Sequence, residues 1–160
     1  MLVTVYVESG IRGLARRSGA GTWLVEYIRK DGTPETRPVD PADAVTWLPD
    51  TTQAALELNM LVDALSILTK PCEVRINTKC EHILSVFEND WLEKWKESGW
   101  KNAKGRPVVN ADLWQQVSKY IDVHEDVLAE KGENSYRNIM QMEILKEEDG
   151  RRKEHGTDIH

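Results

Sequence analysis

This chain of 160 residues has only two cysteines, no long apolar run and no charged segment before its first apolar residues. Its two cysteines, Cys72 and Cys80, are too few for a disulfide framework and have no zinc-binding pattern, so we expect free thiols in a reducing compartment. No apolar run approaches the ~20 residues of a membrane span, and no charged segment precedes the apolar residues of MLVTVYVESG. We therefore expect a cytoplasmic protein without a signal peptide or a membrane partner.

The composition, with 40% hydrophobic and 30% charged residues, is typical of a soluble globular domain. The net charge of −6 argues against nucleic-acid binding, but the charge is unevenly distributed. Residues 125–160 hold ten acidic and six basic side chains, whereas residues 91–106 hold five basic and two acidic ones. The acidity therefore belongs mainly to the C-terminal part.

Strand patterns dominate the first half of the chain. Residues 2–8 alternate and predict a first strand that ends on Glu8. A second strand over residues 22–29 turns at Lys30-Asp31-Gly32, and a proline-containing return strand over about 35–39 suits an edge. We expect residues 41–47 to be irregular and residues 71–78 to form a fourth strand.

Helical patterns fill most of the remainder. Asp50, with Gln53 three residues later, predicts the start of a helix over about 51–69 whose buried stripe is Ala54, Leu58, Leu61, Leu65 and Leu68. Further helices are expected at about 79–88, 90–98, 111–123 and 135–148, the last with Ile139, Met142 and Leu145 on one side. Residues 1–148 would form one domain, and residues 149–160 a disordered charged tail. The segment VHEDVLAEK is compatible with a weak fifth strand or a continued helix.

One stretch is more specific than these patterns. Residues 91–106, WLEKWKESGWKNAKGR, are followed by Asn110-Ala111-Asp112-Leu113-Trp114. The pattern W-x-x-x-W-K-x-x-G-W-K followed by N-x-D-L-W resembles the basic handle of the type 1 ribonuclease H family. The resemblance covers about residues 1–145 and is strongest from 71 to 116. It implies an α/β fold, a ribonuclease H-like mixed five-stranded sheet flanked by helices with a basic handle insertion; we call residues 91–106 the handle.

The resemblance also implies a site of four carboxylates that bind two magnesium ions and hydrolyse a phosphodiester. Its first two positions correspond to Glu8 and Glu57. The third, an Asp within Thr-Asp-Ser in the family, is Lys79 within Thr78-Lys79-Cys80. The fourth is Glu143, or Met142 if the preceding loop is one residue shorter. Glu8 and Glu57 would be metal ligands only if the protein is active.

Lys79 decides the functional interpretation. Its ammonium group would place a positive charge where the family binds divalent cations, and hard cations require oxygen ligands. We hypothesise that Lys79 replaces the metal and forms an ion-pair cluster with Glu8 and Glu57. In that case the protein has no metal cofactor; an active protein would use Mg or Mn.

The resemblance implies two nucleic-acid surfaces. In the handle, the candidates are Lys94, Lys96, Trp100, Lys101, Lys104 and Arg106, because lysine contacts phosphate and exposed indoles stack on bases. Trp91 and Trp95, four residues apart in a helix, are more typical of packing, whereas Trp100 is the better candidate for exposure. The family's minor-groove residues correspond to Gln53, Ala54 and Ala55, a poorer set. Arg12, Arg16 and Arg17 lie in the first expected loop. They either make further phosphate contacts or belong to a loop that is simply solvated.

Three hypotheses follow. The first is a nucleic-acid-binding or accessory module whose phosphodiesterase activity is lost or strongly reduced. The second is a weak Mg/Mn-dependent ribonuclease that cleaves the RNA strand of RNA/DNA hybrids through Glu8, Glu57 and Glu143. The third is a protein-interaction domain on the same fold, which the net charge favours.

Overall fold

The computed structural model describes residues 1–158, with the side chains of residues 1–154. Its sheet has six strands among these residues: β1 (Leu2–Ser9), β2 (Arg16–Ile28), β3 (Pro34–Arg37), β4 (Thr46–Thr52), β5 (Glu73–Asn77) and β6 (Asp126–Glu130). The order is β3-β2-β1-β5-β6, and β4 pairs with β2. β5 runs parallel to β1 and β6, and the other pairings are antiparallel. The predicted mixed sheet is confirmed, and VHEDVLAEK contributes a strand.

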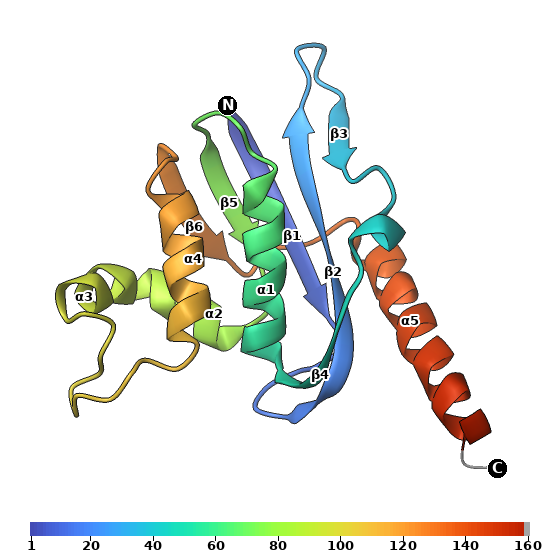
Figure 1. Ribbon diagram of the computed structural model, residues 1–160. Coiled ribbons are helices and arrows are strands. Elements are labelled where there is room, and N and C mark those ends of the chain that lie inside the picture. The colour runs from blue at the N-terminus through green and yellow to red at the C-terminus, as the bar shows by residue number, and fades with distance from the viewer. Residues whose placement is uncertain (159–160) are drawn as a thin grey trace.

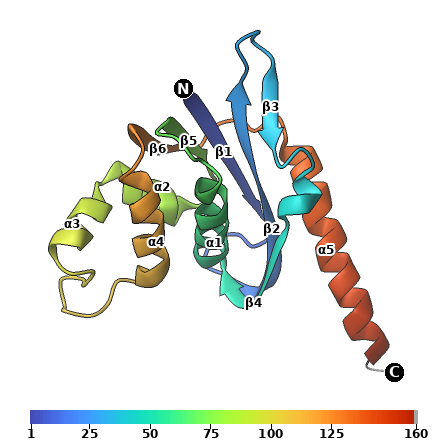
Figure 2. The same cartoon turned by 45° about the horizontal axis from the view of Figure 1, so that its top comes forward.

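Five α-helices accompany the sheet in the described part of the chain: α1 (Gln53–Ser66), α2 (Glu81–Glu88), α3 (Trp91–Glu97), α4 (Ala111–Ile121) and α5 (Arg137–Asp158), with a 3-10 turn at Pro41–Ala44. Figures 1 and 2 show α1 and α4 side by side in front of the sheet, while the segment from β6 to α5 passes behind it. Within the described residues, no helix is both long enough and apolar enough to span a membrane.

The two faces of β1 have different roles because alternate side chains of a strand point to opposite sides. Val3, Val5 and Val7 are buried in the main core, which includes the apolar face of α1. Tyr6 and Glu8 belong to the other face, where the ring of Tyr6 meets that of Tyr136 edge to face at 5.4 Å. Glu8 thereby points to the side of the sheet on which α5 lies.

The start of α1 corrects the sequence interpretation. Thr52, not Asp50, caps the helix, and its hydroxyl accepts a hydrogen bond from the backbone N–H of Ala55 at 3.2 Å. Residues 46–52 form β4, part of which was expected to be irregular, and Asp50 bonds Arg16 instead. β4 forms because it pairs with the early part of β2, a long-range contact that local patterns do not reveal.

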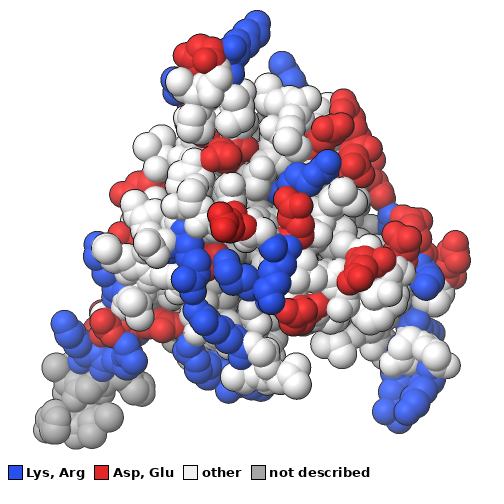
Figure 3. Space-filling model, turned by 180° about the vertical axis from the view of Figure 1, so that it is seen from behind, with Lys and Arg blue, Asp and Glu red and all other residues white. Residues whose placement is uncertain are grey.

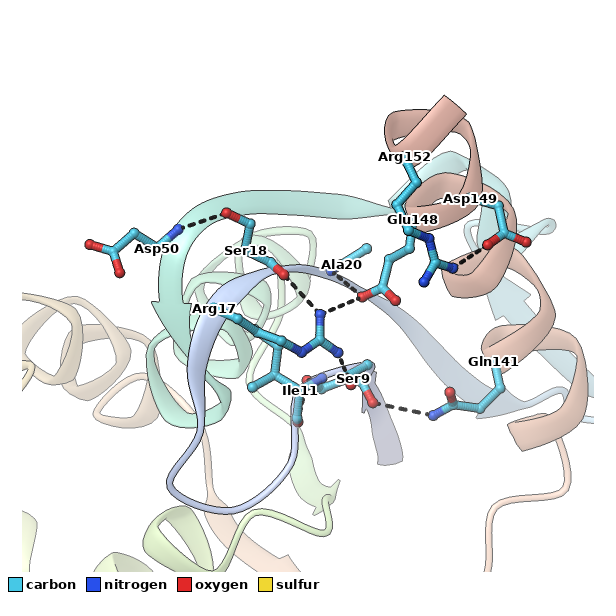
Figure 4. A network of polar contacts seen from close by, with 11 residues as sticks. Ser9, Ile11, Arg17, Ser18, Ala20, Asp50, Gln141, Glu148, Asp149 and Arg152 are labelled. Carbon is cyan, nitrogen blue, oxygen red and sulfur yellow. Dashed lines mark hydrogen bonds and ion pairs between the residues drawn. The ribbon is translucent and has the colours of Figure 1, made fainter. Parts of the chain in front are cut away.

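The last helix, expected to end at about residue 148, is longer than that. Residues 149–158, expected to belong to a disordered tail, continue α5, and residues 159–160 lie outside the described part. The carboxylate of Glu148 accepts hydrogen bonds from the backbone N–H of Ala20 at 3.1 Å and from Arg17 at 3.4 Å, as Figure 4 shows. One turn later, the Arg151 guanidinium lies 3.9 Å from the ring centroid of Trp47. These contacts dock the second half of α5 onto β2 and β4.

Candidate active site

The ends of β1 and β5 bring two predicted site residues together. Tyr6 lies opposite Asn77 in this parallel pair, so Glu8, still within β1, and Lys79, just beyond β5, lie side by side two residues further on. Lys79 Nζ lies 2.9 Å from Glu8 Oε2. The Glu8 side chain is only 3% exposed, whereas that of Lys79 is 37% exposed. The predicted ion pair between these residues is present.

Glu57 lies at the same end of the sheet, in the first turns of α1, but its direct partner is not Lys79. The hydroxyl of Thr78 donates a hydrogen bond to Glu57 Oε1, and the backbone N–H of Cys80 donates to that hydroxyl at 3.0 Å. Burial raises the pKa of Glu57 to about 7, although hydrogen bonds from Thr78 and Gln53 oppose this rise. Glu57 is therefore a buried acid held at the end of β5.

Glu8 is surrounded by donors from the region of α5. Its Oε1 accepts a hydrogen bond from Gln141 Nε2 at 2.9 Å and forms an ion pair with Arg137 Nε at 3.6 Å. Its Oε2 accepts from Asn134 Nδ2 at 3.1 Å as well as from Lys79. A carboxylate only accepts hydrogen bonds, so three donors and the charge of the Arg137 guanidinium engage its two oxygens.

Neither candidate for the fourth position, Glu143 or Met142, contacts Glu8 in the described structure. Gln141 and Arg137 are instead the α5 residues that contact Glu8. Glu143 pairs with Lys146 at 3.2 Å, and the Met142 side chain is exposed. The reason is the rotation of α5: its buried residues are Met140 and Ile144, so the expected side with Ile139, Met142 and Leu145 faces solvent.

A cleft of about 640 Å³ opens over these residues, and it is lined by Glu8, Glu57, Lys79, Gln141, Arg12 and Lys131 among others. The donor set does not fit a divalent metal pair. Magnesium requires oxygen ligands, but both Glu8 oxygens already accept from N–H groups, and the ammonium of Lys79 and the amide of Gln141 lie beside Glu8 where further carboxylates would be needed. Among the described side chains, no group of three His, Cys, Asp or Glu residues lies close enough together to hold a metal ion.

Three residues around Glu8 escaped the sequence interpretation: Asn134, Arg137 and Gln141. Nothing in their local sequence marks them as a site, because amides and arginine are common on exposed helix faces. The one sequence signal that could have grouped Arg137 and Gln141 was their spacing along a helix. Arg137, Gln141, Ile144 and Glu148 are three or four residues apart, so they lie on one face of α5.

The handle comprises α3 and the turn that follows it. Trp91 and Trp95 pack against the main core as expected, and Trp114, in α4, is fully buried. Trp100 was expected to be exposed, but it is partly buried, with its ring centroid 6.4 Å from that of Trp95. The aromatic residues of the handle therefore anchor it to the body of the protein.

The basic residues of the handle mostly face outward. Lys94, Lys101, Lys104 and Arg106 are exposed. Lys96 is engaged by Asp122 at 2.8 Å and by Glu93 at 3.2 Å. Figure 3 shows a separate gathering of Lys and Arg side chains across the middle of the rear face, away from the handle, which lies toward the right of this view.

The second predicted nucleic-acid surface is less open. Gln53 is 8% exposed, and its Oε1 accepts a hydrogen bond from the backbone N–H of Gly13 at 3.0 Å. In the adjoining loop and β2, Arg12 is exposed, Arg16 pairs with Asp50, and Arg17 pairs with Glu148. Gln53 thus shapes the loop between β1 and β2.

Comparisons with known proteins agree with this architecture. The family model described as RNase H matches residues 2–131. The ribonuclease H of Stutzerimonas stutzeri is 44% identical over 77% of this chain and 74% of its own length. Among solved structures, LC9-RNase H1, a type 1 RNase H with the type 2 active-site motif, superposes with a TM-score of 0.60 at 23% identity, over 82% of this chain and 63% of that one. The foamy viral protease-reverse transcriptase in complex with an RNA/DNA hybrid superposes with a TM-score of 0.59 at 17% identity, over 86% of this chain and 18% of that one.

Proposed function

Because this chain belongs to the ribonuclease H family, we propose that it is a nucleic-acid-binding module of that family whose phosphodiesterase activity is lost or strongly reduced. The observation that carries the proposal is the state of Glu8. Its two oxygens are held by Lys79, Gln141, Asn134 and Arg137, so the first metal-ligand position has become an ion-pair centre.

Electrostatics supports the loss of cleavage. Two unit charges ~4 Å apart at an effective dielectric of about 20 interact by ~4 kcal/mol, so a divalent cation beside the Lys79 ammonium would be repelled by about twice that amount. Glu57 offers little compensation, because it is 1% exposed and one of its oxygens accepts a hydrogen bond from Thr78. The chain therefore uses no metal cofactor in this proposal.

Nucleic acid as the partner is supported by the exposed basic side chains of the handle, Lys94, Lys101, Lys104 and Arg106. These side chains can contact phosphates, which give sequence-independent affinity. A structural relative, the foamy viral enzyme, is described in complex with an RNA/DNA hybrid. We propose that this chain binds an RNA/DNA hybrid or a duplex, and that Gln53, with Ala54 and Ala55 after it, gives little discrimination of the RNA strand.

A second candidate is a weak Mg- or Mn-dependent ribonuclease. It is favoured by the 44% identity to a protein named ribonuclease H. Glu8 and Glu57 would be its metal ligands, and Glu143 could not join them without a rotation of α5, because it pairs with Lys146 away from the cleft.

A cleavage assay with a labelled RNA/DNA hybrid, in magnesium and in manganese, separates the two candidates. We expect no cleavage above background from the wild type. Wild-type cleavage that disappears in Glu8→Ala would overturn the proposal and establish the ribonuclease.

The same structure predicts what would reopen a metal site. Lys79→Asp alone leaves Glu8 bonded to Gln141, Asn134 and Arg137, so we expect it to bind Mn²⁺ weakly. The double variant Lys79→Asp/Gln141→Asp should bind Mn²⁺ at least about tenfold more tightly in isothermal titration calorimetry, since each added carboxylate is a hard ligand. Equal affinity of the single and double variants would show that Gln141 has no part in closing the site.

A further inference from the structure

The Lys79 ammonium has bonding capacity that Glu8 does not use. A lysine ammonium carries three N–H donors. In the described part of the chain, Lys79 Nζ has one hydrogen-bond acceptor, Glu8 Oε2, and more than a third of its side chain is exposed. Lys79 also lines the cleft of about 640 Å³. Two N–H donors therefore remain for a group that enters the cleft.

The accessible charge of the cleft has the sign that attracts a phosphate. Glu8 and Glu57 are 3% and 1% exposed, so their carboxylate oxygens lie beneath the cleft surface. Arg12 is exposed, and the ammonium of Lys131 is paired at 3.1 Å with Glu81, an exposed carboxylate that also lines the cleft. Among the described residues, the accessible charged groups of the lining are therefore three cations, Arg12, Lys79 and Lys131, and one carboxylate. In a four-carboxylate site, by contrast, divalent cations must screen the carboxylates before a phosphate can approach.

We propose that this cleft binds a backbone phosphate of the nucleic acid directly on Lys79, with no divalent cation between them. The inference rests on the proposed nucleic-acid binding and deepens it, because it states that Lys79 supplies the positive charge that a bound cation would otherwise bring. Glu8, with its α5 donors, holds the ammonium in place from below. Binding is then independent of divalent cations.

The test is fluorescence anisotropy of a labelled RNA/DNA hybrid, in EDTA and in magnesium at matched ionic strength. The wild type should bind with the same affinity in both buffers. Lys79→Met keeps the aliphatic stem and removes the charge. It should weaken binding about tenfold, the loss expected for one charge-assisted hydrogen bond, and lower the slope of log affinity against log salt by about one.

Two variants control for other effects of the substitution. Lys79→Arg keeps the charge and should retain most of the affinity. Lys30→Ala removes an exposed lysine from the turn after β2, at the other end of the sheet, and should change neither affinity nor salt slope. Thermal unfolding of each variant checks that the fold persists.

The outcomes separate this inference from the proposed function. Tighter wild-type binding in magnesium than in EDTA, or Lys79→Met binding as tightly as the wild type, overturns the direct contact while nucleic-acid binding stands. No binding of the hybrid or of duplex DNA in either buffer overturns both.

Discussion

At the scale of single residues, the exchange of one acid for Lys79 changes the chemistry of its neighbours. A cluster of carboxylates without metal is repulsive, so neutralising one member relieves strain. Here Glu8 instead attracts Lys79 and Arg137 and accepts from two amides. Whether a mutation at Glu8 raises or lowers the free energy of unfolding therefore distinguishes a repulsive carboxylate cluster from an ion-pair site.

We predict that Glu8→Gln lowers the free energy of unfolding by about 1–3 kcal/mol, measured by urea denaturation. Removing one partner of a buried ion pair costs ~3–5 kcal/mol, and the partial exposure of Lys79 reduces this figure by screening. Glu81→Gln is the matched control: its ion pair with Lys131 is exposed on both sides, and we expect a change below ~0.5 kcal/mol. Stabilisation by Glu8→Gln would indicate a repulsive carboxylate cluster instead.

Glu57 predicts a pH dependence of stability. Its pKa is raised to about 7 in the folded protein, so the folded state holds this proton more tightly than the unfolded state. The associated stabilisation is complete below the unfolded pKa of about 4.5 and is lost as pH rises to about 7, a change of about 3 kcal/mol at most.

Denaturation midpoints of the wild type and Glu57→Gln between pH 4.5 and 8.5 test this. The wild type should lose stability relative to the variant as pH rises, because glutamine has no proton to lose. Parallel curves would show that Glu57 does not titrate in this range.

At the scale of elements, α5 decides how the site is completed. The face of α5 that packs on β2 carries Met140 and Ile144, and the same face delivers Arg137, Gln141 and Glu148 to their partners. A rotation of α5 by about 100°, one residue step, would replace Gln141 by Met142.

Paired methionine variants test the rotation of α5. Met140→Ala removes a fully buried side chain and should cost about 2–5 kcal/mol of unfolding free energy. Met142→Ala, two residues away on the same helix, alters a side chain that is 54% exposed and should cost less than ~0.5 kcal/mol. Equal costs, or a larger cost at Met142, in chemical denaturation would contradict this docking of α5.

At the scale of the whole molecule, charge distribution matters more than the net charge of −6. The handle carries exposed lysines on a support of packed tryptophans, so its charges project from a fixed platform. Acidic side chains are prominent on the rear face of the molecule (Figure 3). They would repel the phosphates of a nucleic acid and so favour its binding where basic side chains gather.

Salt dependence of hybrid binding tests that surface. Lys101→Ala and Lys104→Ala should each lower the slope of log affinity against log salt by about one, because each removes one phosphate contact. Lys70→Ala, an exposed lysine in the loop between α1 and β5, should leave the slope unchanged. Affinity that does not respond to salt would favour a protein-interaction domain instead.

The sequence by itself determined the parts that rest on local periodicity and on one specific motif. Alternation in residues 2–8 places Glu8 at the end of β1, and the handle pattern identifies the fold. The lysine at position 79 is visible without coordinates, and it is the residue on which the proposed loss of cation binding rests. Trp91 and Trp95, four residues apart, predict their own packing against the core.

Only the tertiary structure decided which residues complete the site. β4 and the extended α5 depend on contacts with β2 that lie far apart in the chain, and local propensity carries no information about them. Gln141 replaces Glu143 at Glu8 because the packing of Met140 and Ile144 fixes the rotation of α5. The sequence indicated a lysine at a family carboxylate position, whereas the fold showed Glu8 enclosed by three hydrogen-bond donors and a guanidinium. Side chains from three distant segments meet there only when the sheet and α5 pack together.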